Sequence, residues 1–342
     1  MTWWQALVEA GAVPAAFVPP ASTGRSDLEE RAPPPREAGT AADLVEDAEL
    51  QAHPVPERSA APPAPAARVP AGVSFLAGIE RWSVVAYDGV VPVVRAYLAA
   101  AVRRRDGKGV LHTTHQRVRD FALAPLELMN AARREALSAH CPDVEPVAGE
   151  RVGQPALFLE TVETTVRRAR ARLERELAEA CLETLGADDW LVVDGLLSRS
   201  PAVARHPRAL GLIKSHGTQF LEGRGLERAL TLPAGHRTSV FRVRGGHTRT
   251  EVYSWYLRLW PWEGNDLLYG LLRVEARADA EVIARASEVS RWLMAERAPL
   301  ATPDARWDRL LYPLHHVEEY LKSRAPRDLQ LRRVSRLPRT GT

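Results

Sequence analysis

The segment VSFLAGIE, residues 73–80, decides how the rest of the chain is interpreted. It is an apolar run that meets Gly78, which is typical of a buried strand near its end. Two more apolar runs follow at residues 81–89 and 90–102. We predict that the three runs form a β-hairpin or meander that leads into a helix. An enzyme strand is expected to carry a charged group at this end, yet the residue present is Ala77.

A long helix and a second buried strand follow farther along the chain. The spacing of apolar residues predicts a helix over residues 159–185, which Gly186 would end. On this helix Glu174 shares a stripe with apolar side chains, so we expect its carboxylate to face inward. The next run, DWLVVDGLL at residues 189–197, has no polar alternation and is typical of a strand covered on both faces. Asp194 lies near its end, where a buried acid needs a cation or a donor.

Each of the candidate site residues also has a structural interpretation. Glu174 either meets Asp194 across a divalent ion or forms an ordinary ion pair with Arg170. Lys214 directly follows an apolar run and precedes His216 by two positions. It is either a surface side chain with a buried stem or a positive charge directed at a phosphate.

The remaining segments complete a mixed α/β chain. Apolar and aromatic runs between residues 237 and 278 predict further strands, and helices are expected at residues 287–296 and 315–324. The order of these elements predicts a mixed β-sheet flanked by helices. The sequence contains no GxxxxGK[ST], GxGxxG or GxSxG motif, which excludes a P-loop ATPase.

The first 70 residues differ from the rest in charge and in proline content. They carry a net charge of −5, whereas residues 71–342 carry +8, and they hold 12 of the 26 prolines. We predict a disordered, proline-rich linker over residues 21–70. Before it, residues 1–20 are expected to form a short docking helix with an apolar face. That helix either folds back on its own chain or docks on a partner; its docking residues would be Trp3, Trp4 and Leu7.

Several classes of protein are disfavoured by the same composition. No stretch of about 18 uncharged apolar residues occurs, and the first residues lack the basic region of a signal peptide. A cytoplasmic protein without a membrane partner is expected. Cys141 and Cys181 do not form a CxxC motif, so we expect two reduced thiols rather than a zinc site. The basic body is compatible with a nucleic-acid partner.

Five segments, taken in order, resemble the NurA family of nucleases. They are FLAGIERWSVV at 75–85, LERELAEA at 173–180, LVVDGLL at 191–197, LGLIKSH at 210–216 and LYPLHHVE at 311–318. The resemblance spans residues 71–325, and no single motif in it is decisive. It implies a NurA-like nuclease domain over residues 71–342 with an RNase H-like sheet flanked by helices.

The resemblance also implies the residues of a metal-dependent active site. The family carries an Asp in its F-x-D-G-I strand, and here that position is Ala77. The change is either a targeted Asp-to-Ala substitution or a mark of a naturally inactive relative. The implied ligands of Mn²⁺ or Mg²⁺ are position 77, Glu174 and Asp194, and Lys214 and His216 would contact DNA.

The last helix is implied to supply one further polar residue to this site. The family's position falls near Glu318, with His315 and His316 as rivals. The implied activity is hydrolysis of DNA phosphodiester bonds, in end resection, DNA repair or antiphage defence. The implied partners are DNA, a second copy of the chain and a HerA-type hexameric ATPase. Two alternatives stay open: a DNA-binding scaffold subunit without activity, and an RNase H-like enzyme acting on RNA or recombination junctions.

Overall fold

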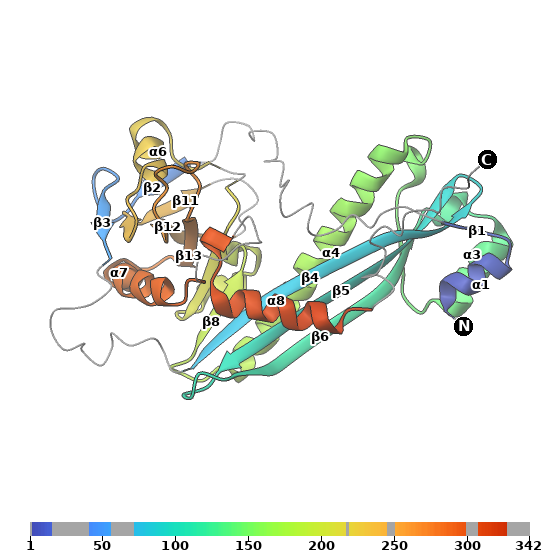
Figure 1. Cartoon of the computed structure of the whole chain (residues 1–342), viewed down its shortest axis with the longest axis horizontal. Coiled ribbons are helices and arrows are strands. Elements are labelled where there is room, and N and C mark those ends of the chain that lie inside the picture. Colours follow the sequence, from blue (N-terminus) through green and yellow to red (C-terminus); the bar gives the residue numbers. More distant parts are fainter. Residues whose placement is uncertain are drawn as a thin grey trace, which may run out of the picture.

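The computed structural model describes residues 2–15, 41–55, 72–216, 219–244, 250–298 and 307–326, and within them thirteen strands form one sheet (Figure 1). The strands are β1 Val13–Pro14, β2 Ala41–Leu44, β3 Ala52–Pro54, β4 Val73–Asp88, β5 Val91–Arg105, β6 Leu111–Ala124, β7 Val144–Pro146, β8 Trp190–Asp194, β9 Ala209–Ile213, β10 His236–Thr238, β11 Phe241–Arg244, β12 Val252–Arg258 and β13 Leu271–Arg277. The helices are α1 Trp3–Glu9, α3 Ala131–His140, α4 Pro155–Thr184, α5 Pro201–Arg205, α6 Gly223–Leu230, α7 Ala280–Ala295 and α8 Tyr312–Arg324. Short 3-10 helices are η2 Leu126–Leu128, η3 Gly149–Arg151, η4 Leu197–Arg199 and η5 Trp307–Arg309.

The order of the strands determines where side chains from different segments can meet. Neighbouring strands run in the order β2-β11-β12-β13-β9-β8-β4-β5-β6-β7. β8 lies parallel to both β4 and β9, whereas β4–β5, β5–β6 and β9–β13 are antiparallel pairs. The prediction of a mixed α/β sheet flanked by helices is therefore confirmed. Because β8 and β9 are parallel, their carboxyl ends lie at the same edge of the sheet.

The predicted hairpin is one long antiparallel pair without a following helix. β4 and β5 turn at Gly89, whose φ of 61° is the left-handed conformation that such a tight turn requires. The alanines at 99–101, near the end of the third predicted run, lie inside β5 and are fully buried. Alanine favours helices, but this run lies between two layers of the fold, and its small side chains allow both layers to pack closely on the strand.

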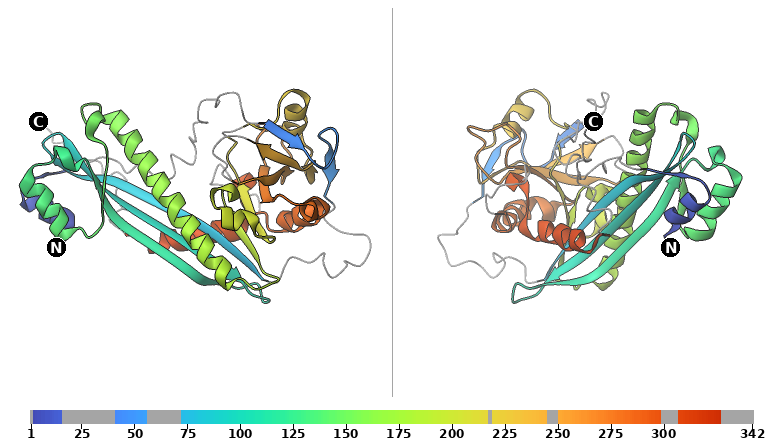
Figure 2. Two further views of the ribbon diagram at one scale, coloured as in Figure 1. Left: turned by 180° about the vertical axis from the view of Figure 1, so that it is seen from behind. Right: turned by 45° about the vertical axis from the view of Figure 1, so that its right-hand side comes forward.

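Helices cover the two faces of the sheet, α4 on one side and α8 on the other (Figure 2). Successive side chains of β4 point alternately to the two faces of the sheet and pack in two different hydrophobic cores. Leu76 packs in the core that contains the apolar residues of α4, whereas Phe75 and Ala77 pack in the core that contains those of α7 and α8. A strand covered on both faces explains why this segment has no polar alternation.

The N-terminal helix α1 packs on its own chain, which corrects the prediction that Trp3, Trp4 and Leu7 dock on a partner. It lies beside α3 at the end of the β4–β5 hairpin that is farthest from α7 (Figure 1). Trp3 is 9% exposed, and Leu7 is fully buried in the core that it shares with α4. The guanidinium carbon of Arg95 lies 4.2 Å from the centre of the Trp4 ring. Packing on its own chain therefore buries Trp3 and Leu7, whereas Trp4 stays partly exposed.

Part of the expected linker also belongs to the sheet. Residues 41–55 contain β2, which pairs with β11, and β3, which pairs with β10. Leu50 and Val55 are each 3% exposed. A disordered linker over the whole of residues 21–70 is thus wrong for this segment, because its scattered apolar residues find partners that are distant in sequence. The other parts of the predicted linker, residues 21–40 and 56–70, lie outside the described residues.

Both cysteines are free and buried, Cys141 after α3 and Cys181 within α4. Burial raises the pKa of the Cys181 thiol to about 11, so this thiol stays protonated at neutral pH. Among the helices of the described residues, none combines the length and the apolar character needed to cross a membrane.

Candidate active site

Three of the predicted site residues converge at the edge of the sheet where β8 and β9 end. Asp194 is the last residue of β8, and Lys214 directly follows β9. The Lys214 ammonium donates to Asp194 Oδ2 over 2.8 Å and to Glu318 Oε1 on α8 over 3.4 Å. The parallel pairing of the two strands brings Asp194 and Lys214 together, and the packing of α8 on the sheet adds Glu318.

Glu174 approaches the same edge from the opposite face of the sheet. It is 8% exposed on the buried side of α4, as its apolar stripe predicts. A Cβ added at Gly78 would lie 2.4 Å from Glu174 Oε1, so the carboxylate occupies the space that a side chain on β4 would fill. Glu174 and Asp194 line one small pocket between α4 and the segment of η4 and α5. Residues from two separate elements, Glu174 on α4 and Asp194 on β8, therefore border one cavity.

Ala77 lies beside this group of residues. The last paired residues of β4 and β8 are Leu76 and Val193, so Ala77 and Asp194 come next on the two strands. Adjacent strands are separated by about 4.8 Å. Ala77 is fully buried and offers no oxygen, whereas an Asp at this position would stand next to Asp194.

The two pocket carboxyl groups have opposite electrostatic surroundings. Burial raises the pKa of Glu174, and the negative charge of nearby Asp194 raises it further. The positive charge of Arg170 lowers it by less, so the pKa of Glu174 lies above its ordinary value. Burial also tends to raise the pKa of Asp194, but the charge and hydrogen bond of Lys214 outweigh it, and the net shift is downward. Asp194 is therefore the firmly ionised member of the pair.

The structure adds two charged residues that the sequence reasoning did not select as site residues. Glu80, two positions after Gly78 on the same face of β4, is 5% exposed. Its carboxylate lies 3.3 Å from the Arg170 Nε, which in turn is 3.8 Å from Glu174 Oε1. The alternation of side chains along β4 predicts that Glu80 lies on the face that α4 covers. Arg170 and Glu174 are four residues apart on one helix, and this spacing predicts an ion pair between them. Arg170 thus lies between two buried carboxylates.

Backbone packing holds the turn that follows Asp194. Gly195 has a φ of 130°, a conformation that side-chain-bearing residues rarely adopt. A Cβ at Gly211 on β9 would lie 2.7 Å from the Gly195 carbonyl oxygen, so two glycines are needed where the turn crosses the neighbouring strand. The fully buried Glu275 carboxylate accepts hydrogen bonds from the backbone N–H groups of Leu197 and Ser198. These contacts fix the position of the Asp194 strand end.

Two histidines near Lys214 and Glu318 in sequence have partners outside the acidic group. His216 donates from Nε2 to the backbone oxygen of Leu271 over 2.9 Å, and burial lowers its pKa to about 4. It is therefore uncharged at neutral pH, and its contact with DNA stays a prediction. His316 pairs with Arg103 through Nδ1 at 2.7 Å. Glu318, rather than His316, forms the hydrogen bond with Lys214.

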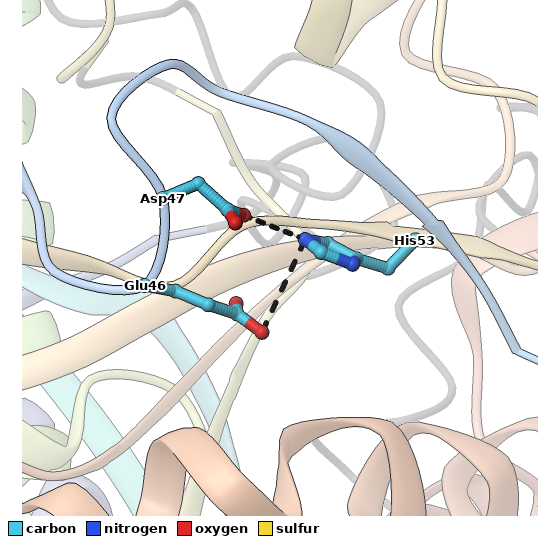
Figure 3. Close-up of side chains that lie close together, drawn as sticks. All are labelled: Glu46, Asp47 and His53. Carbon is cyan, nitrogen blue, oxygen red and sulfur yellow. Dashed lines mark hydrogen bonds and ion pairs between the residues drawn. The ribbon is translucent and has the colours of Figure 1, made fainter.

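A second group of possible metal ligands lies elsewhere, in the segment between β2 and β3 (Figure 3). His53 Nε2 is 2.8 Å from Asp47 Oδ2 and 4.0 Å from Glu46 Oε1. Both carboxylates already have partners: Arg237 donates twice to Glu46, and the Ser239 hydroxyl donates to Asp47. A cation would have to displace these donors, so the contacts are those of a structural clamp.

The oxygen donors at the sheet edge fit a hard divalent cation in part. Glu174 and Asp194 both line one cavity, and carboxylate oxygens are the ligands that such cations prefer. Ala77 leaves the first-strand position without a ligand. No protein-family model and no curated protein matches the chain.

Proposed function

We propose that this chain is a NurA-like, metal-dependent DNA nuclease whose first-strand carboxylate is replaced by Ala77. The observation that carries the proposal is the meeting of Glu174, Asp194 and the Lys214–Glu318 pair at one edge of the sheet, beside Ala77. Separate segments contribute to this group, and such a gathering of buried charges is expensive without a function.

Each residue has a role that follows from its contacts. Glu174 and Asp194 would hold Mn²⁺ or Mg²⁺, together with an Asp at position 77 in the complete site. When bound, such a cation supplies a nucleophilic water and neutralises charge on the phosphate. Lys214 is positioned by Asp194 and Glu318 and would contact the scissile phosphate.

Restoring the missing carboxylate tests this proposal. The Ala77→Asp protein is expected to cleave linear DNA when Mn²⁺ or Mg²⁺ is added and to stop when EDTA removes the cation. Adding Asp194→Ala to Ala77→Asp should abolish the cleavage, because the ligands of one site act as a unit. Melting temperatures of all forms serve as the control for folding. If Ala77→Asp leaves DNA intact at saturating Mn²⁺, with a HerA-type ATPase present, the nuclease proposal is wrong.

A second candidate function is a DNA-binding subunit without catalytic activity. The observation that favours it is Ala77 itself, since its methyl group is buried in a core with Phe75 and Ile79 and provides no ligand. The two candidates differ in the response to Ala77→Asp. Gain of metal-dependent cleavage supports the nuclease, whereas DNA binding with no gain of cleavage supports the inactive subunit.

The proposed partners are those that the NurA resemblance implies: a second copy of the chain and a HerA-type hexameric ATPase. Light scattering on the purified chain tests the dimer, and co-elution with the ATPase tests the complex. Since α1 is packed on α3, these experiments require no contribution from Trp3 or Leu7.

A further inference from the structure

The exposed side of α4 carries a group of arginines that the proposed chemistry does not use. We call Arg167, Arg168, Arg172 and Arg175 the basic band; their side chains lie on the solvent side of the helix. At 100° per residue, Arg168, Arg172 and Arg175 fall on the side of the helix opposite its buried stripe. The only acid between residues 164 and 175 is Glu174, which is buried. The middle of the helix therefore presents positive charge to solvent.

The charges of the basic band are only partly compensated. Arg167 pairs with Glu163 at 2.6 Å, and Arg175 lies 4.0 Å from Glu179, both within the helix. Arg168 and Arg172 form neither an ion pair nor a side-chain hydrogen bond with any residue that the structure describes. Exposed ion pairs within a helix stabilise a protein only slightly. An anionic ligand could therefore displace the two existing partners at low cost.

The basic band leads directly to the candidate active site. Arg175 lines the pocket that Glu174 and Asp194 also line, and Arg199 lines it from η4. Arg168 and Arg175 are seven residue steps apart, which is about 10 Å along the helix axis. This is about three nucleotide steps along one strand of DNA, at about 3.4 Å per step. The arginines thus form a continuous basic path that ends where the carboxylates begin.

We infer that the basic band holds the sugar–phosphate backbone of DNA and directs the strand into the pocket of Asp194. This inference rests on the proposed function for its choice of ligand. Guanidinium groups bind phosphate oxygens through two hydrogen bonds, and such contacts position a nucleic acid without reading its sequence. The next phosphate of the same strand, beyond those that the basic band binds, then lies at the pocket.

Binding of DNA by the chain as it stands, with Ala77 present, tests the inference without any cleavage. Fluorescence anisotropy of a labelled duplex of about 20 base pairs is measured in EDTA over a series of salt concentrations. Arg168→Gln/Arg172→Gln is compared with the matched control Arg134→Gln/Arg224→Gln. The control removes the same charge from arginines on α3 and α6, which do not line the pocket.

The band variant is expected to bind DNA about tenfold more weakly than the parent. It should also lower the slope of log K against log salt by about 0.9 for each phosphate that it no longer neutralises. The control should bind like the parent. Equal binding by all three proteins, or equal weakening in both variants, would overturn the inference, since net charge alone would then explain the result. Absence of DNA binding by the parent would overturn it as well.

The outcome is separable from that of the proposed nuclease. If Ala77→Asp cleaves DNA while the band variant binds DNA like the parent, the inference about the basic band is wrong and the proposed nuclease activity is supported. If the band variant binds DNA more weakly but Ala77→Asp never cleaves DNA, the inference about the basic band is supported and the proposed nuclease activity is wrong.

Discussion

Gly78 shows how a residue without a side chain controls the position of a charged one. Its missing Cβ leaves the space in which the Glu174 carboxylate lies, on the face of β4 that α4 covers. Neighbouring Glu80 and Arg170 then determine the charge around that carboxylate. The geometry of the candidate site thus depends on one glycine in the middle of a long strand.

Gly78→Ala, made in the Ala77→Asp protein, is expected to weaken Mn²⁺ binding about tenfold or more. The added methyl carbon would lie 2.4 Å from Glu174 Oε1, so the carboxylate must move. Changes that misorient a metal ligand reduce metal affinity by about 10–100-fold. Isothermal titration calorimetry with Mn²⁺ measures the effect.

Gly153→Ala provides the control for this measurement, because a Cβ there meets nothing within 4 Å. It should bind Mn²⁺ like its parent. Unchanged Mn²⁺ affinity in the Gly78→Ala protein would show that Glu174 does not serve as a ligand.

At the scale of elements, α1 is a structural part of the hairpin end rather than a free docking segment. Leu7 has no exposed surface, and Trp3 packs with its ring at right angles to that of Trp4, 5.4 Å between centres. Arg133 on α3 donates to the backbone oxygen of Ala10 and pairs with Asp88 at the tip of β4. The helix is therefore held by apolar packing and by a hydrogen bond from α3 to the residue that follows it, and Arg133 in turn is tied to β4.

Leu7→Ala is expected to lower the free energy of unfolding by about 2–5 kcal/mol, because it leaves a cavity in a packed core. Val8→Ala, on the partly exposed side of α1, should cost less. Urea denaturation of both variants and the parent gives the comparison. A Leu7→Ala protein as stable as the parent, with weaker binding to an ATPase partner, would restore the docking interpretation.

At the scale of the whole molecule, residues 41–55 join the start of the chain to its carboxyl-terminal half. Arg237 on β10 is 3% exposed; it donates twice to Glu46 and once to Ser287 on α7. Glu46 also accepts from the backbone N–H of Val240. The clamp therefore connects a strand, a helix and a segment that is distant in sequence.

Glu46→Gln is expected to destabilise the protein by about 3 kcal/mol at neutral pH, because it leaves the buried Arg237 charge without its partner. Burial tends to raise the pKa of Glu46, but Arg237, Val240 and His53 outweigh it, so the pKa in the folded protein is below the ordinary value. An acid of this kind stabilises the fold above its unfolded pKa of about 4.5, and the contribution is lost as the pH falls through the lower folded pKa.

Unfolding free energies of Glu46→Gln and the parent, measured between about pH 7 and pH 3, check both expectations. The parent should lose more stability than the variant on acidification, so that their difference narrows. A difference that stays constant down to the lowest pH would show that Glu46 is not the group responsible.

The sequence by itself determined the elements whose residues interact locally or repeat with a clear period. The strand of Asp194, the long helix with an inward Glu174 and the run that ends at Lys214 all follow from apolar spacing. The family resemblance then directed attention to Ala77 and Glu318. Glu174, Asp194 and Lys214 lie where the predicted elements place them, because helix faces and the ends of β8 and β9 are set by neighbours a few positions away. Ala77, expected at a strand end, lies inside β4 instead.

Only the tertiary structure decided the features that depend on residues far apart in sequence. The alanines of β5 became a strand because two layers cover them, and residues 41–55 became strands because β10 and β11 offered free edges. His216 lost its charge through burial, which the sequence does not show. In each case desolvation and long-range pairing outweighed the local preference of the segment, and these energies exist only once the chain has folded.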